Sequence, residues 1–152
     1  MIEGVVVKKL ITLADRRGFF REIIRGTDNF FAEGFGQLSH SRMFNGVTKA
    51  WHYHHVQVDW WYVASGVLRV GLYDLRGDSA TNKQTVDLLM GDLQPAQVIK
   101  IPPGVAYGCQ TVQGPVDLFY ITSGEYNAED EFRMKYDDPE VGFDWLDGPP
   151  IK

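Results

Sequence analysis

The stretch that decides the fold is Gly46-Val-Thr-Lys-Ala-Trp-His-Tyr-His-His-Val-Gln-Val-Asp59, which continues directly as Trp60-Trp-Tyr-Val-Ala-Ser-Gly66. β-Branched and aromatic residues dominate it, and these residue types favour extended strands. In such a strand the side chains of His52 and His54 point to the same face, because successive residues alternate between faces. If that face lines the interior of a barrel, two imidazoles there need hydrogen bonds or a chemical role.

Short apolar runs of the same kind recur along the rest of the chain, with turn residues between them. Their period of two predicts strands rather than helices. Many short strands at regular spacing are typical of an all-β sandwich or barrel with little helix. The predicted strands are Val5–Lys9, Phe19–Ile24, Phe35–Ser41, Gly46–Tyr53, Asp59–Ala64, Val67–Asp74, Thr85–Leu89, Gln97–Ile101, Val105–Cys109 and Val116–Thr122.

Local sequence features refine this prediction. Ser65-Gly66 separates two strongly β-forming runs, and we expect it to form the turn of a hairpin over Asp59–Asp74. Thr27 is expected to cap a single turn of helix over Thr27–Phe31. From about residue 136 onward, an acidic stretch with Asp-Asp-Pro and Pro-Pro predicts an irregular segment around the barrel. Residues 1–152 are expected to form a single domain.

The composition narrows the possible partners. The 152 residues carry 15 Lys and Arg against 20 Asp and Glu, which gives a net charge of −5. This balance disfavours a nucleic-acid partner, because phosphate binding needs a clustered basic surface. No apolar run approaches the roughly 20 residues that cross a bilayer, so we expect no membrane partner. The lone Cys109 cannot form an internal disulfide, which indicates a reducing, cytoplasmic setting.

The spacing of two glycines, two histidines and an acid in the deciding stretch resembles the first motif of the cupin fold. In this chain the motif comprises Gly46, His52, His54, Asp59 and Gly66, with the Asp where a Glu is usual. Ile101–Gly108 is similar to the second cupin motif, except that Tyr107 replaces its histidine. Metal-binding cupins use these positions, so a metal site here would comprise His52, His54 and Asp59 with open coordination positions.

A closer resemblance covers nearly the whole chain. Six motifs correspond, in order, to those of the dTDP-4-dehydrorhamnose 3,5-epimerase family, whose members are cupin-fold enzymes that act on sugar nucleotides. The second motif corresponds only in part, with Ser39 where the family has Asn. The matching segments are Asp15–Glu22, Gln37–Ser41, Val47–Tyr53, Tyr73–Arg76, Pro102–Gly108 and Thr122–Tyr126. The resemblance implies a cupin-type jelly roll, or double-stranded β-helix barrel, that needs no metal or other cofactor. It also implies a homodimer in which an N-terminal strand is exchanged.

The resemblance also assigns roles to individual residues. It places the catalytic base at His52 and, on the opposite face of the sugar, the acid at Tyr126. Nucleotide phosphates would be held by Arg17, Gln37 and Lys49. The full set of implied substrate-binding positions is Arg17, Phe20, Glu22, Gln37, Lys49, Asp59 and Tyr107.

The chain departs from the family pattern at two functional positions. Asp59 stands where the family has the lysine that stabilises an enolate, and a carboxylate there would oppose negative charge unless it is protonated or bound to a metal. No residue matches the C-terminal Asp that orients the family's base. We hypothesise that Asp59 or Asp138 holds His52 in its place.

The main prediction is therefore a nucleotide-sugar epimerase or isomerase that acts on a 4-keto-6-deoxy sugar linked to dTDP or another nucleoside diphosphate. In this chemistry a base removes the proton next to the ketone, and a proton returns to the other face. One alternative is a metal-dependent cupin enzyme that uses His52, His54 and Asp59. The other is a non-catalytic nucleotide-sugar binding protein.

Overall fold

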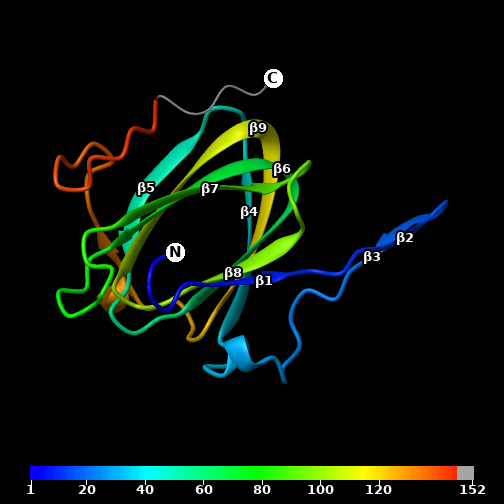
Figure 1. Cartoon of the computed structure of the whole chain (residues 1–152), viewed down its shortest axis with the longest axis horizontal. Coiled ribbons are helices and arrows are strands. Elements are labelled where there is room, and N and C mark those ends of the chain that lie inside the picture. Colours follow the sequence, from blue (N-terminus) through cyan, green and yellow to red (C-terminus); the bar gives the residue numbers. More distant parts are fainter. Residues whose placement is uncertain (147–152) are drawn as a thin grey trace.

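The computed structural model describes residues 1–146, which form a curved all-β barrel with little helix, as predicted (Figure 1). The main sheet runs in the order β1-β8-β6-β9-β5-β10, with β4 also paired to β9 and β7 also paired to β6. A separate hairpin consists of β2 and β3. The elements are β1 (Val6–Lys9), β2 (Leu13–Asp15), β3 (Gly18–Phe20), η1 (Asn29–Phe31), β4 (Gln37–Met43), β5 (Thr48–Tyr53), β6 (Asp59–Asp74), β7 (Thr85–Gly91), β8 (Gln97–Ile101), β9 (Val105–Thr122), η2 (Ala128–Asp130) and β10 (Phe132–Arg133).

The hairpin predicted at Ser65-Gly66 is wrong, because Asp59–Asp74 is one continuous strand. The register between β6 and β9 shifts on both sides of Ser65, which marks an irregular, bulged region rather than a chain reversal. Gly66 has a φ of +76°, and a Cβ on it would lie 2.6 Å from the carbonyl oxygen of Pro115. Gly66 therefore allows the long strand β6 to bend at a point where another residue would clash with β9.

Three other predicted boundaries differ from those in the structure. Val105–Cys109 and Val116–Thr122 were expected as two strands but belong to the single strand β9. The strand expected at Phe19–Ile24 is limited to Gly18–Phe20. The short helical turn exists, but its N-cap is Asp28 and not Thr27. The Asp28 side chain makes no capping hydrogen bond to the turn. Its carboxylate accepts from the Lys8 ammonium group at 2.6 Å, and this contact attaches the turn to β1.

The described part of the C-terminal segment packs on the outside of the barrel, and residues 134–146 contain no helix or strand. Trp145 is buried and belongs to an outer apolar cluster with Trp51 and Tyr73. A Cβ on Gly71 or Gly108 would lie 2.7 or 2.5 Å from its ring. The absence of side chains at these two glycines therefore lets the indole pack directly against the backbone of β6 and β9. This contact holds the end of the described chain on the outside of the barrel.

The β2–β3 hairpin extends away from the barrel (Figure 1). Phe19 and Phe20 at its second strand are 60% and 61% exposed, although large aromatic side chains usually find a partner surface. Within residues 1–146, no helix has the length and apolar character needed to cross a membrane.

Candidate active site

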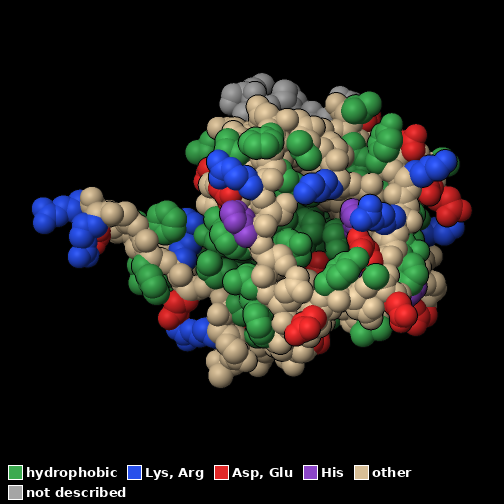
Figure 2. Space-filling model, turned by 180° about the vertical axis from the view of Figure 1, so that it is seen from behind, with side chains coloured by type: hydrophobic (Ala, Val, Ile, Leu, Met, Phe, Trp, Pro, Cys, Tyr) green, Lys and Arg blue, Asp and Glu red, His purple; other side chains and the backbone are tan. Residues whose placement is uncertain are grey.

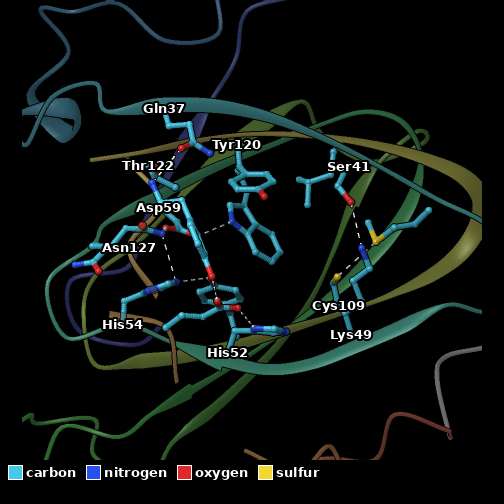
Figure 3. Close-up of a pocket in the computed structure, with 17 residues that line it drawn as sticks. Gln37, Ser41, Lys49, His52, His54, Asp59, Cys109, Tyr120, Thr122 and Asn127 are labelled. Atoms are coloured by element: carbon cyan, nitrogen blue, oxygen red, sulfur yellow. Dashed lines mark hydrogen bonds and ion pairs between the residues drawn. The ribbon is translucent and has the colours of Figure 1, made fainter. Parts of the chain in front are cut away.

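A cavity of about 280 Å³ lies between β4, β5, β6, β9 and the segment around residues 126–131. The molecule is visibly hollowed on one face, and charged and histidine side chains gather at the edge of the hollow (Figure 2). Inside the cavity, Lys49 and Ser41 lie at one end and His54 and Asp59 at the other, with His52 between them (Figure 3).

β5 places two of these side chains in the cavity through an irregular register. Lys49 and His52 are three residues apart, so a regular strand would point them to opposite faces. The register against β9 shifts between these two residues, and both side chains line the cavity. This irregularity brings a cation and an imidazole to the same wall.

His52 has the properties of a general base. Its Nδ1 lies 3.8 Å from Oε1 of Glu131, whereas its Nε2 forms no hydrogen bond with any residue of 1–146. Burial, followed by the positive charge of Arg133, lowers the pKa of His52. The imidazole is therefore neutral near pH 7 and can accept a proton at a free nitrogen.

Tyr126 has the properties of a general acid. Its hydroxyl donates to Oε2 of Glu131 at 3.1 Å, and this hydrogen bond is the main reason why the pKa of Tyr126 is raised. Its backbone N–H donates to Oε1 of Gln37 at 3.0 Å. The phenol thus stays protonated near neutral pH at the edge of a cavity that also contains a neutral imidazole.

Glu131 was missed by the sequence reasoning. The structure places neither Asp59 nor Asp138 against His52: the first accepts from Gln57, and the second accepts from the backbone N–H of Glu140. Glu131 precedes β10, which has only two residues and leaves no readable alternation. The one available signal was its position five residues after Tyr126 in an acidic turn.

A buried network of His54, Gln57, Asp59 and Tyr107 forms the other end of the cavity. The Asp59 carboxylate accepts from Gln57 Nε2 at 2.7 Å and from Trp61 Nε1 at 3.3 Å. Burial raises the pKa of Asp59 and also that of Tyr107. Burial therefore favours the neutral form of this acid at the family's lysine position, whereas its two hydrogen-bond donors act in the opposite direction.

His54 is fully engaged within this network. Its Nδ1 contacts the backbone carbonyl of Asp130 and must donate to it, which leaves Nε2 to accept from the Tyr107 hydroxyl at 2.9 Å. A metal ligand needs a free nitrogen lone pair. Among residues 1–146, no three His, Cys, Asp or Glu side chains are grouped so that they could hold a metal ion. The alternative set His52, His54 and Asp59 thus lacks a metal-binding geometry.

The positions expected to bind the nucleotide separate into two groups. Lys49 and Gln37 line the cavity; the Lys49 ammonium group donates to Ser41 Oγ at 3.3 Å and forms no ion pair within residues 1–146. Arg17 and Phe20 lie on the projecting hairpin, and Glu22 follows it as the partner of Arg25. None of these last three lines the cavity of its own chain.

A β-barrel of this topology, with a polar cavity between its walls, has the architecture of cupin-fold proteins. The model of the dTDP-4-dehydrorhamnose 3,5-epimerase family matches residues 1–152, and the chain belongs to this family.

Two curated relatives match nearly the full length. The spore coat polysaccharide biosynthesis protein SpsL of Bacillus subtilis is 44% identical over 148 residues, covering 95% of this chain and 97% of the relative. The probable low-salt glycan biosynthesis epimerase Agl13 of Haloferax volcanii is 32% identical, covering 95% of this chain and 94% of the relative.

Solved structures confirm the jelly-roll fold. A dTDP sugar isomerase from Desulfovibrio desulfuricans superposes with a TM-score of 0.89 at 24% identity, covering 97% of this chain and 94% of that one. NovW, a 4-keto-6-deoxy sugar epimerase from Streptomyces spheroides, superposes with a TM-score of 0.87 at 25% identity, covering 99% of this chain and 78% of that one.

Proposed function

We propose that this protein is a nucleotide-sugar epimerase or isomerase that acts on a 4-keto-6-deoxy sugar linked to dTDP or another nucleoside diphosphate. The observation that carries the proposal is that one cavity is lined both by His52, whose Nε2 has no partner within residues 1–146, and by Tyr126, whose hydroxyl is a hydrogen-bond donor. Membership of the epimerase family supports the same reaction. The names of two relatives support a role in polysaccharide or glycan assembly.

The reaction needs only proton transfers. Nε2 of His52 removes the proton from the carbon next to the C4 ketone, and the electron pair of that C–H bond forms an enolate. Tyr126 then donates its hydroxyl proton to the opposite face of the same carbon, and the ketone is restored with inverted configuration. Because no electron leaves the sugar, the chemistry requires no redox cofactor.

This chain differs from its family in the group that would stabilise the negative charge on the enolate oxygen. A donor or cation must stabilise that oxygen, and Asp59 replaces the family's lysine. Its burial supports a neutral carboxyl group, which removes the repulsion that a carboxylate would cause. Tyr107 lines the same cavity and is our candidate for a substrate contact, but its hydroxyl proton is donated to Nε2 of His54 and does not supply the donor to the enolate.

The nucleotide would lie at the end of the cavity that holds Lys49. An ammonium group without an acidic partner in residues 1–146 is suited to bind a diphosphate. Gln37 lines the same cavity but lies toward its Asp59 end (Figure 3).

We further propose that the site is completed in a homodimer, in which Arg17, Phe20 and Glu22 reach the nucleotide of the partner subunit. The exposure of the aromatic hairpin residues supports this arrangement. The single, buried Cys109 supports a cytoplasmic location.

Incubation of the protein with dTDP-4-keto-6-deoxyglucose in deuterium oxide tests the activity. NMR should show loss of the sugar proton at C3, at C5 or at both, together with a new epimer. The pattern would separate single from double epimerisation. Binding of the sugar nucleotide without any exchange would contradict the proposal and favour the non-catalytic alternative.

Complementation tests the dimer. Sedimentation should give a species at twice the 17.2 kDa of one chain. The variants His52→Asn and Arg17→Ala should each have low activity, and a refolded mixture should recover part of it. Recovery is expected because, in a mixed dimer with exchanged hairpins, both defects fall in one site and the other site is intact. A mixture with no more activity than its components would contradict the exchange.

A further inference from the structure

We propose that the Glu131 carboxylate is the positioning group of the acid–base pair, with one oxygen facing the base His52 and the other holding the acid Tyr126. This inference rests on the proposed function and names a residue of the same site. It answers a question that the sequence leaves open, since no residue of this chain matches the Asp that orients the family's base.

The two oxygens of Glu131 face different partners. Oε1 lies 3.8 Å from Nδ1 of His52 and accepts from Nη2 of Arg133 at 2.9 Å. Oε2 accepts from the Tyr126 hydroxyl at 3.1 Å. One carboxylate thus connects the two groups that the reaction requires, and Arg133 fixes its orientation.

The backbone on either side holds Glu131 in this position. The preceding Asp130 carboxylate accepts the backbone N–H groups of His55 at 2.7 Å and Gln57 at 2.9 Å. The following residues form β10, in which Arg133 is paired with His52 of β5. Glu131 is therefore held on both sides by contacts with the segment His52–Gln57, which contains the base. Its approach to His52 follows from the pairing of β10 with β5.

The negative charge of Glu131 raises the pKa of both partners, which makes His52 a stronger base and Tyr126 a weaker acid. Burial and three neighbouring groups lower the pKa of His52, whereas Glu131 raises it. The three neighbours are Arg133, His54 and Lys49. On Tyr126, the Glu131 hydrogen bond raises the pKa, while Arg133 opposes it. Arg133 and the Tyr126 hydrogen bond in turn lower the pKa of Glu131 and keep it ionised.

The geometry also selects the tautomer of the base. A carboxylate beside Nδ1 favours a proton on that nitrogen, so the lone pair lies on Nε2, which has no partner within residues 1–146. When Nε2 takes the substrate proton, the imidazolium gains an adjacent negative charge. Glu131 therefore stabilises the charged form of the base at the step where it appears, without touching the reacting carbon.

Glu131→Gln tests this role because it keeps the shape and one acceptor oxygen but removes the charge. The matched control is Glu129→Gln, an exposed acid of the adjacent turn that does not line the cavity. The first measurement is the titration of His52 by NMR in the free proteins. Removal of the carboxylate should lower the pKa of His52 by about one unit, whereas the control should leave it unchanged.

The second measurement is turnover as a function of pH for the same variants. Glu131→Gln should lower kcat by about 10- to 100-fold, with a smaller effect on KM, and shift the acidic limb to lower pH. An unshifted His52 titration would overturn the proposal, even with reduced turnover, because Glu131 would then act only on fold or substrate. Since the titration uses no substrate, an inactive wild-type protein would contradict the proposed function and leave this test intact.

Discussion

Two sets of side chains that line the cavity differ in how completely their polar atoms are paired. In the buried network of His54, Gln57, Asp59 and Tyr107, the polar side chains are joined by hydrogen bonds. In the open set of Lys49, His52, Tyr126 and Glu131, Nε2 of His52 has no hydrogen-bond partner among residues 1–146. The Lys49 ammonium group donates to Ser41 Oγ and has no acidic partner among the same residues.

Exposure follows the same division. The His52 side chain is 26% exposed, whereas that of His54 is 11% exposed. His52 in β5 and His54 just after the end of that strand therefore have different chemistry available to them. The free Nε2 of His52 and the Lys49 charge are available to a ligand, whereas the hydrogen-bonded atoms of the buried network maintain the shape and polarity of the wall. Changes in the open set should alter turnover or affinity, and changes in the buried network should first alter stability.

The largest expected effect is the loss of the base. His52→Asn should lower the rate of solvent exchange by on the order of 10³-fold, because asparagine cannot accept the sugar proton. The control is His55→Asn, an exposed histidine outside the cavity, which should keep its rate within a factor of two or so of the wild type. Equal losses of exchange rate in the two variants would contradict the assignment of the base to His52.

The next effect concerns the unpaired cation. Lys49→Met should weaken dTDP binding by on the order of tenfold, since one charge-assisted contact to phosphate is lost. Calorimetry at two salt concentrations can measure this, with Lys9→Met, an exposed lysine on β1, as the control. If both variants bind dTDP like the wild type, the diphosphate lies elsewhere.

The smallest effect, on stability, tests the buried network. The pKa of Asp59 is raised by burial in the folded state, and its unfolded value is about 3.9. Its stabilising contribution is therefore present below pH 4 and is lost as the pH rises through the folded pKa. Relative to wild type, Asp59→Asn should become more stable as pH rises from 4 to 8, by about 1.4 kcal/mol for each pH unit that separates the unfolded and folded pKa values.

Denaturant unfolding at several pH values measures this difference. Every other carboxyl group is common to both proteins, and the hydrogen bond altered by the amide contributes a constant offset. A difference in unfolding free energy that does not change with pH would contradict a raised pKa at Asp59.

The sequence predicts the barrel well because strand periodicity and the order of six motifs are properties of the chain itself. It fails at Ser65-Gly66, where the same residues suit either a tight turn or an irregular region within a strand. That choice depends on whether β9 extends as a partner along the whole of β6. Pairing between distant segments carries no local signal.

The site shows the same limit. His52, Tyr126, Lys49, Gln37, Asp59 and Tyr107 were predicted from motif positions, and the structure brings all six to one cavity. Glu131 could not be predicted, because its contact with His52 arises from the register of a two-residue strand. The hairpin residues Arg17 and Phe20 do not reach the cavity of their own chain, so a second chain is needed to test their roles.

The most direct test of the open set compares exchange with inversion in Tyr126→Phe. If His52 and Tyr126 act on opposite faces of one carbon, a protein without the acid can still remove the proton and return a deuteron to the same face. NMR in deuterium oxide should then show exchange near the wild-type rate, with formation of the inverted epimer reduced by about 100-fold. Exchange and inversion that fall together, or that both stay at wild-type levels, would contradict the separate roles of these two residues.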